Sequence, residues 1–226
     1  MSAGGRRVCV LLSGGGRSLE NLLRRQEAGD LDCEFVRVVA SRRNIRGIDV
    51  ARDAGIEVSL VARRDFGDSA DFVARMNETV LEVEPDLVVM AGFLSHWPPP
   101  PALGGKVINI HPSLLPLFGG KGFYGHHVHE AVLGSGMRVS GCTVHFVDEA
   151  YDRGAVILQR SCPVLPDDDA DSLAARVFVE ECRALPDALR WCLDGWVRLD
   201  QGRSRYREEA ILEMRRVDRD PTSPPI

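Results

Sequence analysis

The chain lacks two features that would place it in or across a membrane. No apolar run among its 226 residues is long enough to span a bilayer. Its first residues, Met-Ser-Ala-Gly-Gly-Arg-Arg, lead straight into a short apolar stretch without the core of a signal peptide. We therefore expect a cytoplasmic protein. Because 44% of the chain is hydrophobic, it can bury a sizeable core in one large domain or two small ones.

Cysteine pairs of the metal-binding kind are also absent. The six cysteines are scattered and no Cys-x-x-Cys occurs, which argues against a zinc ribbon and against a disulfide framework. Buried free thiols in a reducing cytosol are the simplest account. His126, His127 and His129 lie close together in the sequence, but a helix would turn His127 away, and no carboxylate or thiol completes the set. We expect no metal.

An excess of positive charge is missing as well. The formal net charge is −5 and the isoelectric point is near 5.7, which argues against a general binder of nucleic acid or of a membrane surface. Small anionic substrates stay compatible with this charge, because the groups around a site decide such binding.

What the sequence does have is a regular alternation of strand-like and helix-like segments. Strands are expected at residues 8–12, 35–40, 56–61, 86–91 and 107–110. Helices are expected at residues 18–25, 48–54 and 70–83. This order predicts an α/β fold with a mostly parallel sheet and helices on both faces.

The second half of the chain changes character. Residues 139–147 and 155–164 are long strand-like runs separated by a polar segment, and they predict an antiparallel extension of the same sheet. Residues 172–194 predict a long helix with Asp171 as its N-cap. Pro186 lies inside that helix and should kink it or split it.

Residues 107–116, Val-Ile-Asn-Ile-His-Pro-Ser-Leu-Leu-Pro, place two polar side chains at the end of a buried strand. The apolar residues before His111 are β-branched, as such a strand prefers. Asn109 and His111 are two residues apart and so point to one face, and Pro112 ends the strand. One interpretation is a site that holds a developing oxyanion. The other is a strand whose polar residues meet water at its end.

The loop Ser-Gly-Gly-Gly-Arg-Ser at residues 13–18 is expected between the first strand and the first helix. Glycines let the backbone approach a ligand, and a helix N-terminus offers N–H groups to a phosphate. The spacing matches neither a Walker A motif nor a full dinucleotide fingerprint. A mononucleotide-type phosphate suits it better than NAD, because Glu34 lies at the start of the second strand and not at its end. A tight turn without a ligand is the alternative.

Asp152 is the candidate acid. It precedes Arg-Gly between two expected strands, where Asp-x-Gly is usually a turn signature. The functional interpretation is a carboxylate that faces Asn109 and His111, raises the pKa of the imidazole and accepts a proton.

Two further histidines lie in informative places. His145 alternates with apolar residues in an expected strand and is interpreted as structural, packed behind the site. His96 and Trp97 precede a run of prolines, and their loop either lines a ring-shaped ligand or forms a surface turn.

Four blocks of sequence carry a family resemblance. They are Leu-Ser-Gly-Gly-Gly from residue 12, Pro-Asp-Leu-Val-Val-Met-Ala-Gly-Phe from residue 85, Asn-Ile-His-Pro-Ser-Leu-Leu-Pro from residue 109, and Val-His-Phe-Val from residue 144 through Asp-Arg-Gly at residue 154. With them the chain resembles the phosphoribosylglycinamide formyltransferases, a family of folate-dependent enzymes. The resemblance implies a Rossmann-like open sheet, parallel in its N-terminal half, with an antiparallel C-terminal extension.

The resemblance runs from about Arg7 to Leu199, nearly the whole chain, and no internal linker divides it. It implies a single domain over residues 1–216. The implied parts are a nucleotide-binding half at about 7–105, a catalytic and folate-binding half at about 106–199, and a charged, Pro-rich and disordered tail at 217–226.

The resemblance also implies roles for individual residues. The catalytic trio is Asn109, His111 and Asp152. Residues that bind the ribonucleotide are Gly16, Arg17, Ser18 and Glu181. Residues that line the folate pocket are Arg64, Leu94, Ser95, His96, Trp97 and Asn109.

The implied reaction moves the formyl group of 10-formyltetrahydrofolate, as co-substrate, onto the amine of glycinamide ribonucleotide in purine synthesis. Asn109 and a protonated His111 would stabilise the oxyanion, and Asp152 would keep His111 charged. Direct transfer needs no metal and no covalent enzyme intermediate. The implied partners are small molecules, with no nucleic acid and no membrane, and the protein is expected to be a monomer or a homodimer.

The chain departs from the common family pattern at several positions. Gly15 and Ser18 stand where Asn is frequent, Arg17 where a small residue is common, and Ser95 where Arg is typical. The loop at residues 117–125 is longer and richer in glycine, and it could close as a flap that brings Lys121 near the phosphate.

Other functions within and outside this superfamily compete with that reading. Formyltetrahydrofolate hydrolase is the main alternative, but it carries an extra N-terminal domain. Methionyl-tRNA formyltransferase and sugar-nucleotide formyltransferases need additional C-terminal structure. A nucleotide-binding regulatory module would have no need for Asn109, His111 and Asp152 together.

Overall fold

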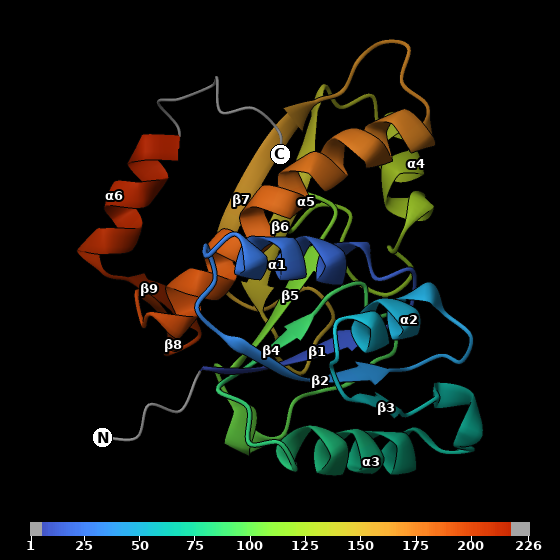
Figure 1. Ribbon diagram of the computed structural model, residues 1–226. Helices are drawn as coiled ribbons and strands as arrows, with labels where there is room; N and C mark the ends of the chain where they lie inside the picture. The colour runs from blue at the N-terminus through green and yellow to red at the C-terminus, as the bar shows by residue number, and fades with distance from the viewer. Residues whose placement is uncertain (1–5, 218–226) are drawn as a thin grey trace.

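The computed structural model describes residues 6–217 and builds them around one seven-stranded sheet (Figure 1). The strand order is β3-β2-β1-β4-β5-β6-β7. The first five are parallel to one another, and β6 and β7 continue the sheet antiparallel, so both parts of the predicted sheet are confirmed. The strands are β1 (Arg7–Leu12), β2 (Glu34–Ala40), β3 (Val58–Leu60), β4 (Leu87–Met90), β5 (Val107–His111), β6 (Val139–Phe146) and β7 (Val156–Pro163).

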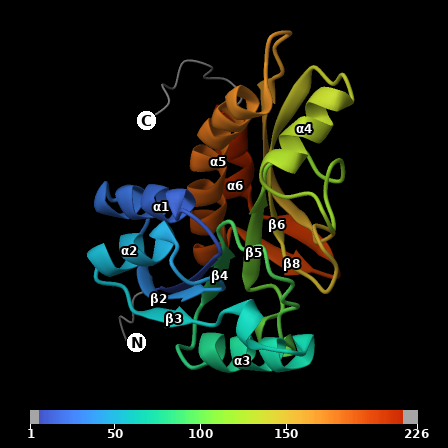
Figure 2. The same ribbon diagram turned by 90° about the vertical axis from the view of Figure 1, so that its right-hand side faces the viewer.

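Helices cover both faces of the sheet, as predicted. On one face lie α1 (Arg17–Glu27), α2 (Arg46–Asp53) and α5 (Ala170–Leu193), and on the other lies α3 (Ser69–Leu81) (Figure 2). Near the antiparallel end, α4 (His126–Gly134) packs beside α5. Short 3₁₀ turns occupy Arg63–Asp65 and Pro101–Leu103.

The sequence of β1 explains why both faces are covered. Val8, Val10 and Leu12 join the core beneath α1, α2 and α5, whereas Cys9 and Leu11 join the core against α3. A strand that is apolar on both sides is typical of a parallel sheet buried between two layers of helices.

The N-cap of α5 is Asp169, not Asp171. Asp169 accepts a hydrogen bond from the Ser172 backbone nitrogen at 2.8 Å, and the Ser172 hydroxyl accepts one from the Asp169 backbone nitrogen at 3.0 Å. This reciprocal capping box fixes the start of the helix at Ala170. The prediction of Asp171 was wrong because it started the helix two residues late.

Pro186 lies inside α5, but the helix is continuous from Ala170 to Leu193 and is not split. A proline cannot donate to the carbonyl four residues earlier, which here belongs to Cys182. The side-chain amide of Asn21 in α1 donates to that carbonyl at 2.8 Å instead. The carbonyl left free by the proline is therefore satisfied, and the bond joins α1 to α5.

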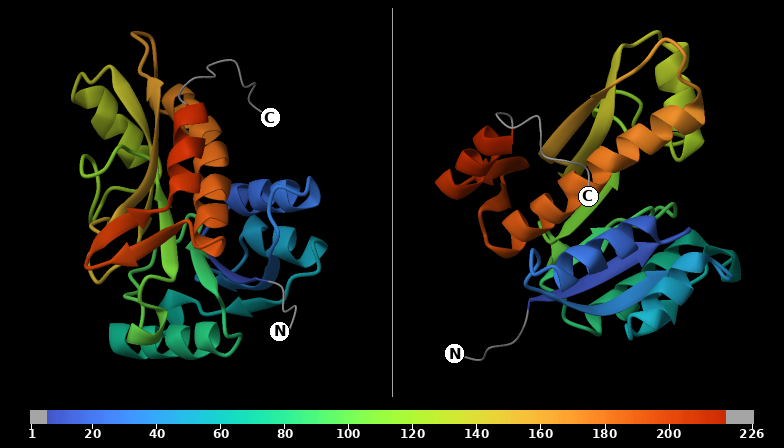
Figure 3. Two further views of the ribbon diagram at one scale, coloured as in Figure 1. Left: turned by 90° about the vertical axis from the view of Figure 1, so that its left-hand side faces the viewer. Right: turned by 45° about the horizontal axis from the view of Figure 1, so that its top comes forward.

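The segment after α5 forms a hairpin and a last helix that the sequence analysis did not predict. The Tyr206 hydroxyl donates to carbonyl oxygens of Val156 and Ile157, each at 3.0 Å, along the outer strand β7. These elements, in red at the end of the molecule away from α2 in Figure 3, are β8 (Val197–Asp200), β9 (Arg203–Tyr206) and α6 (Glu208–Val217).

The structure bears on the predicted C-terminal tail and on the absence of a membrane-spanning segment. Val217, where the predicted disordered tail begins, is the last residue of α6, and residues 218–226 lie outside the described residues. Within residues 6–217, no helix is both long enough and apolar enough to cross a membrane.

Candidate active site

Two neighbouring cavities lie at the carboxyl ends of the parallel strands, where the strand order reverses between β1 and β4. Ligands of open α/β sheets usually bind at such a point. The central pocket, of about 480 Å³, is defined by Arg17, Asn109, His111, Asp152 and Glu181. The side pocket, of about 660 Å³, is defined by Arg42, Arg63, Arg64, Ser95 and His96. Leu94 and Tyr151 line both.

The end of β5 presents Asn109 and His111 to the central pocket, as the alternation predicted. Ile108 and Ile110 point the other way, into the core beneath α5. His111 is only 4% exposed, so the interpretation of a polar pair meeting open water does not hold for the imidazole.

Hydrogen bonding fixes how the His111 ring is presented. Its Nε2 lies 2.8 Å from the carbonyl oxygen of Phe118, which can only accept, so Nε2 carries a hydrogen. Its Nδ1 lies 3.6 Å from Oδ2 of Asp152. The predicted approach of Asp152 to His111 is therefore present in the structure.

Asp152 is held from three sides. Its Oδ2 accepts a hydrogen bond from the Gly120 backbone nitrogen at 2.8 Å, and its Oδ1 lies 3.7 Å from Nε2 of His145. Its φ of 53° is in the left-handed region, which Asp tolerates better than most residues. Burial alone would raise the pKa of Asp152, but His145, His111 and the Gly120 N–H outweigh burial and lower that pKa below its usual value. The carboxyl is thus ionised at neutral pH.

The expectation that His111 stays charged needs a correction for the ligand-free protein. Burial lowers the pKa of His111, and Asp152 and the Phe118 carbonyl raise it, but the effect of burial is the larger. The net effect is to lower the pKa of His111 from its usual value. Asp152 therefore acts in the predicted direction, while the neutral imidazole still predominates at pH 7.

His145 is a residue of the site that the sequence analysis underrated. It lies opposite Asn109 in the β5–β6 ladder. Its Nδ1 lies 2.8 Å from the carbonyl oxygen of Phe146, and its Nε2 lies 3.1 Å from the amide nitrogen of Asn109. His145 therefore orients the carboxamide of Asn109. The period-two alternation of β6 indicated which face of the strand His145 occupies. The sequence did not show that His145 pairs with Asn109, because it does not reveal the register between β5 and β6.

The residues assigned to the ribonucleotide are brought together, with one exception. Arg17, Ser18 and Glu181 line the central pocket beside the catalytic candidates. Burial raises the pKa of Glu181 to about 7, and Arg17 opposes that rise. Gly16 does not line the pocket. Its φ is 77°, and a Cβ there would lie 2.7 Å from the Cα of Gly47, so it is needed for the contact between the loop and α2.

The glycine-rich loop before α4 lies over the same pocket. Residues 120–125, which include Lys121, line it together with His129. Gly119 has no room for a side chain, because a Cβ there would collide with Leu115 and lie 3.2 Å from Cβ of Asp152.

The three neighbouring histidines have separate surroundings. His126 pairs with Asp171, His127 pairs with Glu130, and His129 is buried. No cluster of three metal-type side chains occurs in the part of the chain from 6 to 217.

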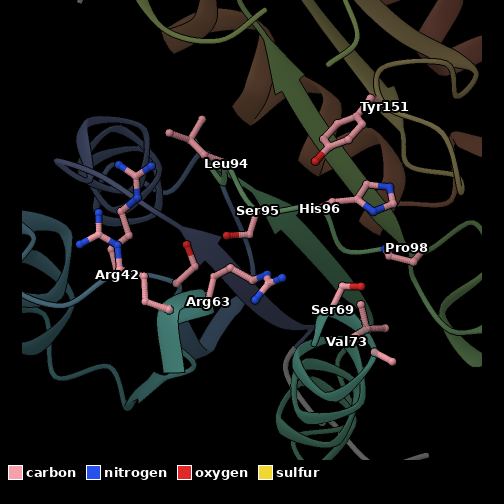
Figure 4. A pocket seen from close by; sticks show the side chains of 12 residues that line it. Arg42, Arg63, Ser69, Val73, Leu94, Ser95, His96, Pro98 and Tyr151 are labelled. Carbon is pink, nitrogen blue, oxygen red and sulfur yellow. The ribbon is translucent and has the colours of Figure 1, made fainter. Parts of the chain in front are cut away.

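The side pocket holds most of the residues assigned to the folate (Figure 4). Arg64, Leu94, Ser95 and His96 line it. Arg42, Arg63 and Tyr151 also line the side pocket and were not predicted from the sequence. The ring of Tyr151 lies 4.5 Å from that of His96, and the two side chains form one wall of the pocket. An arginine that follows the carboxyl end of a strand, as Arg42 follows β2, was the available signal.

Two residues assigned to the folate do not line the side pocket: Asn109 lines the central pocket, and Trp97 lines neither pocket. Trp97 is buried elsewhere. It is 2% exposed and belongs to the core against α3, where its Nε1 donates to Oδ1 of Asn77 at 2.8 Å. Its ring therefore does not line the side pocket. Because Trp97 and His96 are adjacent, the sequence did not show which of the two side chains is buried in the core and which lines the pocket.

Comparison with known proteins shows the family to which the chain belongs. A sequence profile described as formyl transferase matches residues 6–189. The chain belongs to this formyltransferase family. The family membership expected from the four sequence blocks is thus confirmed.

Individual members agree with this membership. The chain is 40% identical, over 78% of its length, to a protein of Vigna unguiculata named phosphoribosylglycinamide formyltransferase, chloroplastic. The structure of glycinamide ribonucleotide transformylase 1 from Symbiobacterium toebii superposes with a TM-score of 0.82 at 32% identity, over 91% of this chain and 95% of that one. The chain spans only 57% of the Vigna protein and far less of the multifunctional proteins it also matches.

A formyltetrahydrofolate deformylase from Pseudomonas syringae also superposes, with a TM-score of 0.79 at 24% identity, over 90% of this chain and 66% of that one. At this identity the likeness shows a common fold and nothing finer.

Proposed function

We propose that the protein transfers the formyl group of 10-formyltetrahydrofolate to the amine of phosphoribosylglycinamide, in purine synthesis. The observation that carries the proposal is the composition of the central pocket, where Asn109, His111 and Asp152 lie beside Arg17 and Glu181. A group-transfer centre and groups suited to a sugar phosphate thus share one cavity. The names of the relatives point to the same reaction.

The chemistry begins when the amine attacks the formyl carbon and the formyl oxygen gains negative charge. The Asn109 amide and the His111 imidazole stabilise this oxyanion. The negative charge raises the pKa of His111, and the ionised Asp152 at 3.6 Å supports its protonation. The proton lost by the attacking nitrogen passes, by way of water held at Asp152, to the folate nitrogen as its bond to the formyl carbon breaks.

Each substrate has a pocket of suitable charge. The ribonucleotide occupies the central pocket, with Arg17 and Ser18 at its phosphate and Glu181 at its sugar. The folate occupies the side pocket, where Arg42, Arg63 and Arg64 offer guanidinium groups to its glutamate carboxylates. The wall of Leu94 and Tyr151 that both pockets share is where the formyl group passes between them.

The deciding experiment follows folate absorbance with both substrates present and with each omitted. The proposal expects turnover only when glycinamide ribonucleotide and 10-formyltetrahydrofolate are supplied together. Formate release without the ribonucleotide, and no formylated product with it, would replace the proposal by formyltetrahydrofolate hydrolysis.

A further inference from the structure

A stacked pair joins two helices at the mouth of the central pocket. The guanidinium carbon of Arg17 lies 3.7 Å from the ring centroid of Phe178. Arg17 is the first residue of α1 and Phe178 lies in α5, and the two helices pack against each other (Figure 1). Both side chains line the central pocket.

Stacking fixes a guanidinium without using its hydrogen-bond donors. The ring covers one face of the planar group, and the N–H groups stay free around its edge. Within residues 6–217, no hydrogen bond or ion pair engages the guanidinium of Arg17. The guanidinium is therefore held in place while its N–H donors remain available to a ligand.

Neighbouring carboxylates are kept from claiming those donors. Glu20, in the first turn of α1, is bound by Arg46, which also donates to the Gly15 carbonyl at 3.1 Å. Glu181 lies three residues after Phe178 in α5, and within residues 6–217 no ion pair joins it to Arg17, although Arg17 lowers its pKa. The guanidinium can therefore meet an anion in the central pocket, which Arg17 lines.

We propose that Phe178 is a positioning residue that holds Arg17 flat at the edge of the central pocket, so that the guanidinium edge meets the phosphate monoester of the ribonucleotide. This inference rests on the proposed function, because it names the group that the phosphate meets. Arg17 is the group that touches the ligand, and Phe178 acts through it.

The test uses the full chain with Phe178→Leu, Phe178→Tyr, Arg17→Ala and the double variant Arg17→Ala/Phe178→Leu. We expect Phe178→Leu to raise KM for glycinamide ribonucleotide about 5- to 10-fold, with kcat and the KM for the folate unchanged. Phe178→Tyr keeps the aromatic face and should restore the wild-type KM. Val179→Ala, at an exposed neighbouring position of α5, is the matched control and should change nothing.

The double variant separates positioning from packing. If Phe178 acts through Arg17, removing the ring has no further effect on KM once the guanidinium is gone. An equal loss in both backgrounds would overturn the inference, and so would an unchanged KM in a Phe178→Leu protein that melts like the wild type.

A binding measurement keeps the inference distinct from the proposed function. Calorimetry with glycinamide ribonucleotide, in the absence of folate, should show the same 5- to 10-fold loss for Phe178→Leu. With the same ligand lacking its phosphate, wild type and variant should bind equally. That pattern in a protein without formyl transfer would refute the proposed reaction and support the positioning role. Equal binding of the phosphorylated ligand by both proteins would refute the positioning role alone.

Discussion

The central pocket and the side pocket are neighbours, but they are built in different ways. Lining residues of the side pocket come from positions 41–98, apart from Tyr151, and they include arginines without any carboxylate. Lining residues of the central pocket come from positions 17–181 and include ionisable groups of both signs. The side pocket therefore offers charge for recognition. The central pocket offers opposed groups that shift one another's pKa, which is what chemistry requires.

The largest expected effect comes from a substitution that disables the chemistry of the central pocket and leaves the side pocket intact. Asp152→Asn removes the charge beside His111 and the acceptor of proton transfer, so kcat should fall by about 10²- to 10⁴-fold. KM for the folate should stay near the wild-type value, because the arginines of the side pocket are intact. Steady-state kinetics with either substrate varied would measure both, and near-normal kcat would remove Asp152 from the mechanism.

The second prediction is that acid destabilises the folded protein through His129, a buried residue that lines the central pocket. Burial lowers the pKa of His129 from 6.5 to about 4, with His126 and His111 adding to this. Between these values the unfolded chain binds a proton that the folded protein does not. The free energy of unfolding should therefore fall by up to about 3 kcal/mol as the pH drops from 6.5 to 4.

Urea unfolding at pH 7 and pH 5 measures this effect. His129→Gln should lessen the loss of stability at pH 5, whereas the exposed His127→Gln is the control and should not. Equal acid sensitivity of the two variants would place the effect on other groups.

A third, smaller effect tests the loop that holds Asp152. Gly119→Ala introduces a methyl group against Leu115 and Asp152, so it should cost about 1–3 kcal/mol of stability and lower kcat. Gly134→Ala, at the end of α4 where a Cβ meets no atom within 4 Å, is the matched control. A fully active and stable Gly119→Ala protein would show that the loop gives way without moving the carboxylate.

The smallest expected effect tests whether the two pockets bind different substrates. Arg64→Ala should raise KM for the folate about tenfold and leave KM for the ribonucleotide unchanged, because one guanidinium–carboxylate contact of about 1.4 kcal/mol is lost. Arg17→Ala should do the reverse. If either variant raises both KM values equally, the two pockets do not bind separate substrates.

The sequence predicted what depends on local pattern and family motif. The alternation around Asn109 and His111 was enough to place both on one face of β5, and apolar spacing gave the parallel sheet. Contacts between distant segments were beyond it. Nothing local shows that His145 meets Asn109, that Arg42 joins Arg64, or that Phe178 covers Arg17.

Other predictions were wrong because two neighbouring residues could each fill the same structural role. Trp97 and His96 are adjacent, and only the packing of α3 decides which ring is buried. Asp169 and Asp171 are both acceptable N-caps, and the side chain of Ser172 selects the first. The pKa of His111 depends on a balance between burial and Asp152, and burial is a property of the whole fold.

The hydrogen bond from Asn21 to the carbonyl of Cys182 bears on how the chain is synthesised. Its partners are 161 positions apart, and it joins the helix that carries Arg17 to the helix that carries Phe178 and Glu181. A ribosome that has released the first hundred residues has supplied every residue that lines the side pocket except Tyr151. The lining of the central pocket is complete only when α5 has emerged, because Arg17 comes from α1 whereas Phe178 and Glu181 come from α5.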